Sequence, residues 1–114
     1  MYKIVPSKKF LKQIKKYSKK FKNLGNDIEE LYNLLSQDPK SGVFIKNNVY
    51  KIRIKNSDNN KGKSGGYRVM TYVVDENNKV YLLTIYSKSE LDNIEDHYID
   101  ELIEEVKSIQ ESEE

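Results

Sequence analysis

The feature that most constrains the fold is a change in the spacing of apolar residues near residue 49. Before this point apolar residues recur every three or four positions, as on one face of an α-helix. From residue 49 they alternate with polar residues, as in β-strands with one buried face. A chain of 114 residues has the length of one domain, so we predict a single α+β domain over residues 1–114.

The N-terminal part is predicted to form a short strand and a helical hairpin. "YKIV" is the strand, and Pro6 with Ser7 supplies a boundary and a helix N-cap. The first helix buries Phe10, Leu11, Ile14, Tyr17 and Phe21. The second begins near Asn26, which with Glu29 resembles a capping box, and stops at Asp38-Pro39. Its apolar stripe is Ile28, Leu31, Leu34 and Leu35.

Three strands and a last helix are predicted after residue 49. The strands are "VYKIRIK", "YRVMTYVVD" and "KVYLLTIYSK", and the turn residues of "DENNK" join the last two as an antiparallel hairpin. Apolar residues return to helical spacing over 93–110, with Asn93 as the N-cap. The predicted fold is therefore a small antiparallel twisted sheet packed on an N-terminal helical hairpin, with an acidic C-terminal helix.

Charge is distributed unevenly along the chain. Residues 1–88 hold 19 Lys and Arg against 7 Asp and Glu, a net charge of +12, whereas residues 89–114 carry −10. The basic body favours a polyanionic partner. The acidic tail could be a solvated helix face, an internal mimic of the polyanion, or a surface that faces a partner.

Residue types exclude several kinds of protein. The chain has no cysteine, hence no disulfide and no thiolate metal site, and its one histidine, His97, makes a metal role improbable. We expect no metal and no cofactor. The absence of a long apolar run predicts a cytoplasmic protein without a signal peptide or membrane span.

Strand alternation predicts which side chains share a face of the sheet. If the three strands are neighbours, four cations and two phenols lie together: Lys51, Arg53, Arg68, Tyr72, Tyr86 and Lys88. The opposite face, expected beneath the helical hairpin, carries Ile52, Val69, Val73, Leu83 and Ile85. Because Met70, Val74 and Leu82 share the parity of the charged set, part of the charged face must be covered, and the C-terminal helix could cover it.

The loop "NSDNNKGKSGG" precedes the middle strand. Lys61 and Lys63 in this loop invite phosphate, and its glycine pair allows positive φ angles or the close approach of another backbone. The loop lacks the spacing of a nucleotide-binding P-loop. It could equally be a flexible turn.

Three motifs together resemble one family of proteins. In order and spacing, "YKIRIK", "GKSGGYRVMTYVVD" and "YLLTIYSKSE" resemble the RelE/ParE superfamily of bacterial toxins, most closely its HigB-like branch. The resemblance implies a type II toxin: a ribosome-dependent endoribonuclease that cuts messenger RNA and is silenced by a cognate antitoxin. It places the family's functional cations on Lys51, Arg53, Arg68 and Lys88, while its C-terminal aromatic residue could be Tyr86 or Tyr98.

RNA cleavage through the 2′-hydroxyl requires three kinds of group and no metal. It needs a base for that hydroxyl, positive charge for the phosphorane, and an acid for the leaving 5′-oxygen. Like charges nearby favour a neutral lysine, which makes Lys51 the candidate base, while Arg53 and Arg68 suit the phosphate. Lys88 or Tyr86 could protonate the leaving group, and Tyr72 or Tyr86 could stack on a base of the RNA.

Other functions remain compatible with these residues. A ParE-like DNA gyrase inhibitor would share the fold without needing the cations, and a non-catalytic nucleic-acid-binding module would need only the basic charge. The lysine-rich first helix could be a solvated face, or it could dock on ribosomal RNA.

Overall fold

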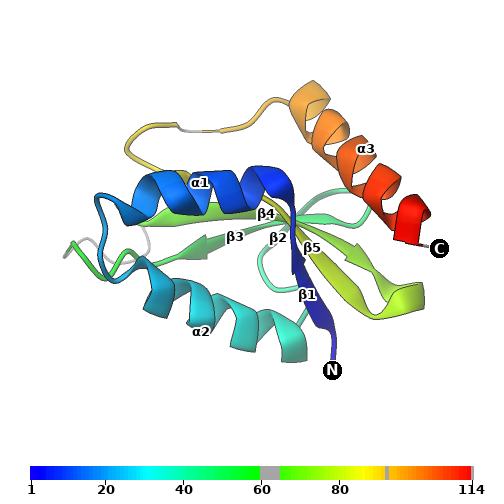
Figure 1. The fold of residues 1–114 in the computed structure, drawn as a ribbon, viewed down its shortest axis with the longest axis horizontal. Coiled ribbons are helices and arrows are strands. Elements are labelled where there is room, and N and C mark those ends of the chain that lie inside the picture. Colours follow the sequence, from blue (N-terminus) through cyan, green and yellow to red (C-terminus); the bar gives the residue numbers. More distant parts are fainter. Residues whose placement is uncertain (60–64, 92, 114) are drawn as a thin grey trace.

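The computed structural model describes residues 1–59, 65–91 and 93–113. Within these ranges the elements are β1 (Lys3–Pro6), α1 (Lys8–Ser18), α2 (Leu24–Gln37), β2 (Val43–Lys46), β3 (Val49–Ile54), β4 (Tyr67–Val74), β5 (Lys79–Ser87) and α3 (Asp96–Glu113), with a short 3₁₀ turn (Asp75–Asn77) between β4 and β5. Figure 1 shows α1 and α2 lying across the sheet and α3 at the far end of a long connection from β5. The predicted α+β class is confirmed.

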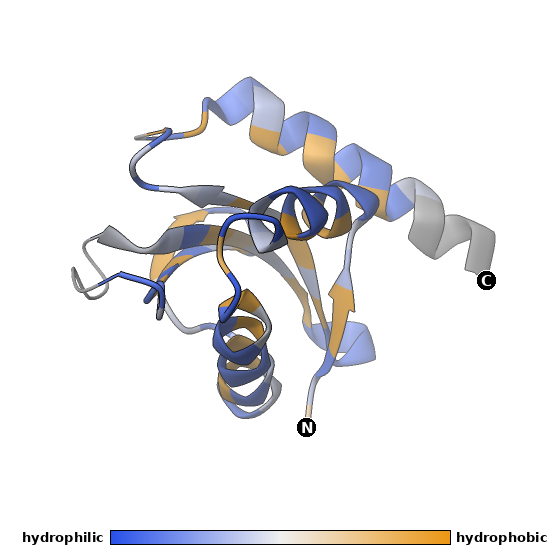
Figure 2. Cartoon of the chain, turned by 60° about the vertical axis from the view of Figure 1, so that its left-hand side comes forward, coloured by the Kyte–Doolittle hydropathy of each residue, from blue (hydrophilic) through white to orange (hydrophobic). Residues whose placement is uncertain are grey.

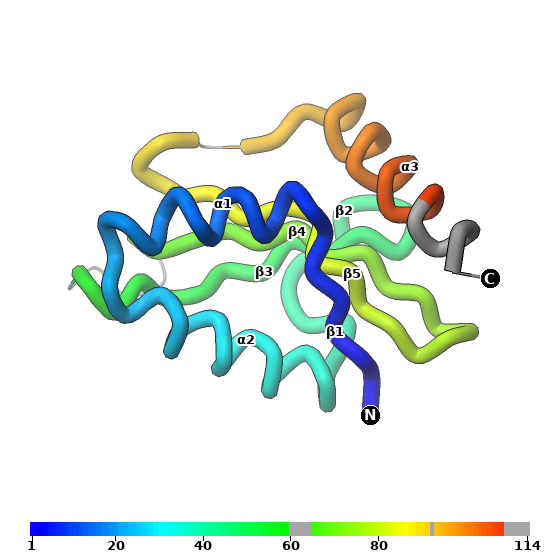
Figure 3. The backbone as a smooth tube through the Cα atoms, viewed as in Figure 1, coloured from blue at the N-terminus to red at the C-terminus, as the bar shows by residue number. Residues whose placement is uncertain are grey.

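The strands form one sheet in the order β1-β5-β4-β3-β2. The pairs β2/β3, β3/β4 and β4/β5 are antiparallel, as predicted for the three long strands. The short strand β1 lies parallel to β5, which makes the sheet mixed. Figure 3 shows β1 running from the N-terminus beside β5 to the start of α1, at the edge of the sheet.

Helices cover both faces of the sheet and create two cores. The hairpin core joins α1 and α2 to one face and includes Phe10, Tyr17, Leu31, Ile52, Val69 and Leu82. The α3 core lies on the other face and includes Met70, Leu83, Tyr86, Ile99, Leu102 and Val106. In Figure 2 the apolar stretches of α3 face the sheet. The expectation that the C-terminal helix covers part of the charged face therefore agrees with the packing.

The start of α1 agrees with the sequence, whereas the start of α2 does not. Ser7 is the predicted N-cap: its Oγ accepts the Phe10 N–H at 3.0 Å and donates to the Leu83 carbonyl at 2.9 Å. The helix α2 begins at Leu24, so the capping box predicted at Asn26 is wrong. Its N-cap is Asn23, whose backbone N–H donates to the carboxylate of Asp58, more than 30 residues away in sequence.

A β-bulge reverses two of the predicted side-chain orientations. Met70 pairs with Thr84, but the next residue, Thr71, pairs with Leu82, so Leu83 is an extra residue in β5. An extra residue shifts the alternation by one position, which periodicity cannot reveal. Leu82 consequently lies in the hairpin core and Leu83 in the α3 core, the opposite of the prediction.

Candidate functional site

Three predicted site residues form a row across the sheet. Arg53 on β3 is the register partner of Arg68 on β4, which in turn is the partner of Tyr86 on β5. Side chains in such positions have Cβ atoms roughly 4.5–5.5 Å apart. Lys51, two residues before Arg53, projects from the same face of β3. We call Lys51, Arg53, Arg68 and Tyr86 the cationic row.

Exposure differs sharply between the two arginines. The Arg53 side chain is exposed and Lys51 is half-buried. Arg68 is only 4 % exposed, so sharing a face with the exposed Arg53 does not bring it to the solvent. Its Nη1 donates to the Tyr67 carbonyl at 3.3 Å. Burial, together with the positive charge of Arg53, lowers the pKa of Arg68 below its ordinary value. A buried guanidinium thus adds positive charge beneath the exposed part of the row.

Tyr86 lies at the covered end of the row. It is 3 % exposed and packs in the α3 core, beneath residues such as Ile94 and Ile99. Its hydroxyl has no hydrogen-bond partner among the described residues. Burial raises the pKa of the Tyr86 phenol, with Arg68 acting in the opposite direction. The phenol is therefore protonated at neutral pH and can donate a proton rather than accept one.

Lys88 directly follows β5, at the end of the sheet where Gly66 precedes β4. Its backbone N–H donates to the Gly66 carbonyl at 3.1 Å. A Cβ on Gly66 would lie 2.0 Å from the Ile54 carbonyl oxygen, so only glycine fits there. Gly66 therefore serves the close approach of β3 and not a positive φ angle. The hydrogen bond to Gly66 then holds the backbone of Lys88 beside the first residue of β4.

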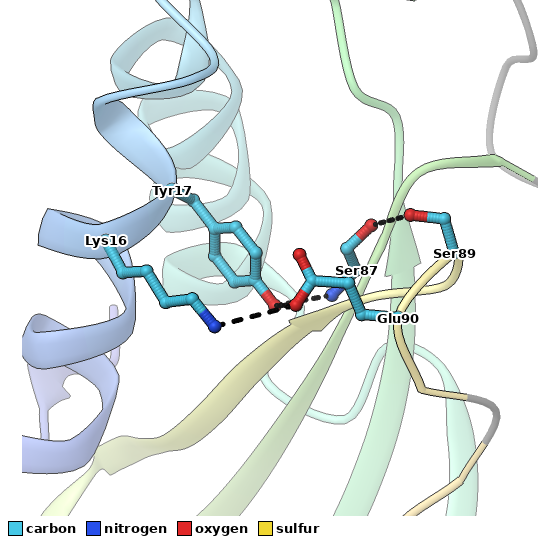
Figure 4. Close-up of polar contacts among 5 residues, drawn as sticks. All are labelled: Lys16, Tyr17, Ser87, Ser89 and Glu90. Carbon is cyan, nitrogen blue, oxygen red and sulfur yellow. Dashed lines mark hydrogen bonds and ion pairs between the residues drawn. The ribbon is translucent and has the colours of Figure 1, made fainter.

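A tyrosine from α1, Tyr17, makes hydrogen bonds to Ser87 and Glu90, which lie on either side of Lys88 in the sequence (Figure 4). The Tyr17 hydroxyl accepts the Ser87 N–H at 3.1 Å and donates to Glu90 Oε2 at 3.4 Å. Lys16 Nζ lies 3.6 Å from the same carboxylate oxygen. Burial raises the pKa of Tyr17, against the effect of the Ser87 N–H, so the phenol keeps the proton that it donates. The sequence pattern predicted Tyr17 only as part of the apolar stripe of the first helix. A tyrosine in such a stripe brings a hydroxyl that needs a hydrogen-bond partner when buried, and this signal could have indicated its role.

Replacing Tyr17 by Phe should destabilise the protein while leaving its ring packing in place. The buried Ser87 N–H would lose its acceptor, which typically lowers the free energy of unfolding by about 1–3 kcal/mol. Urea denaturation measures this change. Ser18→Ala is the matched control, because it removes only an exposed hydrogen bond from the Ser18 hydroxyl to the Lys15 carbonyl and should stay within about 0.5 kcal/mol of the parent. Equal stability of Tyr17→Phe and the parent would contradict the assigned hydrogen bond.

Two predicted aromatic residues lie away from the row. Tyr72 has the parity of Arg68 but sits four residues along β4, about 13 Å away at the rise of a strand. It packs beside Tyr81 in the α3 core, with ring centroids 6.5 Å apart. Tyr98 lies on α3, half-buried against the same core. Lys61 and Lys63, predicted to contact RNA, lie outside the described residues.

Neither a metal cluster nor a membrane-spanning helix is found in the described ranges. No three His, Cys, Asp or Glu side chains of residues 1–59, 65–91 and 93–113 gather where they could hold an ion. Among the same residues, none of the helices is both long and apolar enough to cross a bilayer.

The open surface beside the row is a groove between α2 and the sheet. Arg53 and Leu34 line two adjoining hollows, of about 350 and 580 Å³. Ile54 and Lys55 border the first, and Lys51 the second. The hollows lie on the hairpin side of the sheet, and Asp27 and Glu30 also line the first of them. Because the side chains of Lys51 and Arg53 share the α3 side with Met70 and Tyr86, the hollows border the cationic row and are not its binding surface.

Comparison with known proteins agrees with this architecture. The model of a family described as the RelE toxin of the RelE/RelB toxin-antitoxin system matches residues 2–114. The isolated E. coli RelE toxin superposes with a TM-score of 0.59 at 18% identity, covering 96% of this chain and 99% of that one. The matched chain of the intact E. coli RelBE toxin-antitoxin complex superposes with a TM-score of 0.56 at 18% identity, covering 75% of this chain and 94% of that one. A double arginine-to-alanine variant of E. coli RelE in the free state superposes with a TM-score of 0.57 at 17% identity, covering 80% of this chain and 87% of that one.

Proposed function

The chain belongs to the RelE toxin family, and from this membership we propose that it is the toxin of a type II toxin-antitoxin pair that cleaves messenger RNA on the ribosome. The proposal places its action in the cytoplasm, where translated messages are found. Its assignment to the HigB-like branch stays a prediction.

The cationic row is the observation that carries the proposal. Arg53 and Arg68 are partners on adjacent strands, and no carboxylate among the described residues forms an ion pair with Arg53. Burial lowers the pKa of Arg68, and the positive charge of Arg53 lowers it further, so the two arginines repel each other. Such repulsion is relieved by an anion of two charges, such as the phosphorane of RNA cleavage.

Each residue can be given a role in that reaction. Lys51 is proposed to take the proton of the 2′-hydroxyl, whose oxygen attacks the adjacent phosphorus. Exposed Arg53 binds a phosphate oxygen through its guanidinium fork, and Arg68 stabilises the same charge from beneath. The bond to the 5′-oxygen then breaks, and Lys88 supplies the proton, because the hydroxyl of Tyr86, the other candidate, is buried in the α3 core. The products are a cyclic phosphate and a free 5′-hydroxyl, with no oxidant, metal or cofactor involved.

Brief expression of the chain should halt growth and create new 5′ ends in translated messages. Naked RNA should be cut slowly or not at all, since the row contains cations but no strong base, and the ribosome would have to position the substrate. Mapping of RNA 5′ ends, with and without ribosomes, measures this dependence. Equal cleavage of naked and translated RNA would refute it.

The same experiment separates the alternative functions. Intact messages together with altered plasmid supercoiling would indicate a ParE-like DNA gyrase inhibitor. Intact messages with unchanged topology, but with RNA bound to the purified protein, would leave a non-catalytic binding module.

A cognate antitoxin is the second proposed partner. Support comes from the RelBE complex, in which a chain of similar fold is bound to its antitoxin. An acidic segment of the antitoxin would complement the exposed Arg53 and the half-buried Lys51 and could occlude them. The product of the neighbouring small gene should therefore co-purify with this chain and abolish its toxicity. A chain that stays monomeric and harmless beside that product would contradict the toxin assignment.

A further inference from the structure

The first 26 residues carry a charge that the cationic row does not use. They include nine lysines and no Asp or Glu. Four of these lysines are exposed and recur along one line of α1 and its C-cap: Lys8, Lys12, Lys15 and Lys19. At about 100° per residue these positions fall within a narrow sector of the helix surface. We call them the α1 ridge.

The ridge is unfavourable for the helix that carries it. Neighbours three or four residues apart repel, as Lys8 does Lys12 and Lys15 does Lys19. Lys8 also lies at the positive end of the helix dipole, and no acidic residue occupies the first turn. Among the described residues no carboxylate lies within 4.0 Å of the ridge lysines; the one ion pair of α1 joins the neighbouring Lys16 to Glu90. A charge arrangement that destabilises the helix carrying it indicates a binding role.

Lysines elsewhere on the surface are treated differently. Lys40 pairs with Asp75, Lys46 with Asp100 and Lys55 with Glu30. Three lysines elsewhere on the surface are thus paired with carboxylates, whereas none of the ion pairs found within the described ranges involves a lysine of the ridge.

The chemistry of the ridge favours one class of polyanion. The apolar side of α1 is occupied by the hairpin core, where Phe10 and Tyr17 are buried, so the helix has no free apolar face for a membrane. No aromatic residue belongs to the ridge, and single-stranded RNA would lack a stacking partner there. One lysine per turn, about 5.4 Å apart along a rigid axis, suits instead a fixed row of phosphates.

We propose that the α1 ridge binds the phosphate backbone of double-stranded RNA, independently of sequence. The ridge belongs to the hairpin side of the sheet, whereas the cationic row projects from the α3 side. The two surfaces can therefore be occupied together, one by a duplex and the other by a single strand to be cut. The inference rests on the proposed function, because that function brings the chain to RNA.

Binding of the purified full chain to a blunt 16-base-pair RNA duplex tests the proposal. The ridge variant changes Lys12, Lys15 and Lys19 to Gln, and the charge-matched control changes Lys40, Lys46 and Lys55 to Gln. The ridge variant should bind on the order of 10- to 100-fold more weakly near 0.1 M salt. Its plot of log affinity against log salt should lose roughly 2–3 units of slope. The control variant should bind like the parent.

Several results would overturn the proposal. Equal weakening by both triple variants would mean that only net charge matters. Unchanged duplex binding by the ridge variant would remove the site altogether. Equally tight, ridge-dependent binding to a 16-nucleotide oligouridine or to vesicles with 30 mol% phosphatidylserine would replace the duplex by another polyanion.

A further variant separates this proposal from the proposed function. Arg68→Ala should bind the duplex like the parent and still associate with ribosomes, although its cleavage is lost. If the parent cuts no message but binds the duplex through the ridge, the proposed function fails and the ridge stands. If messages are cut and the ridge variant binds the duplex like the parent, the duplex-binding proposal is refuted while the proposed function stands.

Discussion

Replacing Arg68 by Met is expected to lower RNA cleavage on the ribosome by on the order of 100- to 1,000-fold. The phosphorane would lose a charge that lies in a shielded position, 4 % exposed, where water cannot replace it. Stability should hold or rise slightly, because Met fills much of the same volume and burial already disfavours the charged guanidinium. Single-turnover cleavage and thermal melting of the same preparation measure the two effects.

Two companion variants sharpen this expectation. Arg68→Lys keeps the positive charge without the guanidinium fork, so its rate should fall between those of Met and the parent. Arg53→Met removes the exposed guanidinium of the row, which should weaken RNA binding. It should also remove the electrostatic repulsion between Arg53 and Arg68. If Arg68→Met melts far below the parent, Arg68 is a structural residue and its catalytic role is refuted.

Leu83→Ala should lower the free energy of unfolding by about 2–5 kcal/mol. Leu83 is fully buried in the α3 core at the bulge of β5, and its truncation leaves a cavity between the sheet and α3. The melting temperature should fall on the order of 10 °C. Cleavage should decline only in proportion to the loss of folded protein.

An exposed leucine provides the control for this variant. Leu11 is 52% exposed on α1, and Leu11→Ala should stay within about 0.5 kcal/mol of the parent. A Leu83→Ala protein that remains fully folded yet loses cleavage would show that Leu83 positions the site, which the packing does not suggest.

A comparison of Leu83→Ala with Leu82→Ala tests the two cores separately. Leu82, the neighbour of Leu83, is fully buried in the hairpin core. Leu82→Ala should destabilise to a similar degree through a different layer. Because both leucines lie on one strand, the comparison shows whether α3 contributes as much to stability as the hairpin does.

Local features of the sequence determined most of the elements and the composition of the row. Helical and strand periods depend on the geometry of a single segment, so they predicted α1, β3, β4 and β5 and the N-cap at Ser7. Alternation alone placed Arg53 and Arg68 on one face, because a regular strand has a period of two. The uneven charge of the chain was likewise a property of composition.

Only the tertiary structure decided the features that depend on contacts between distant segments. The bulge at Leu83 arises from pairing with β4, and the burial of Arg68 from neighbouring elements of the fold. The role of Tyr17 depends on Ser87 and Glu90, about 70 residues away. Gly66 is required by the Ile54 carbonyl of another strand. No local period encodes such contacts, since each exists only once the chain is packed.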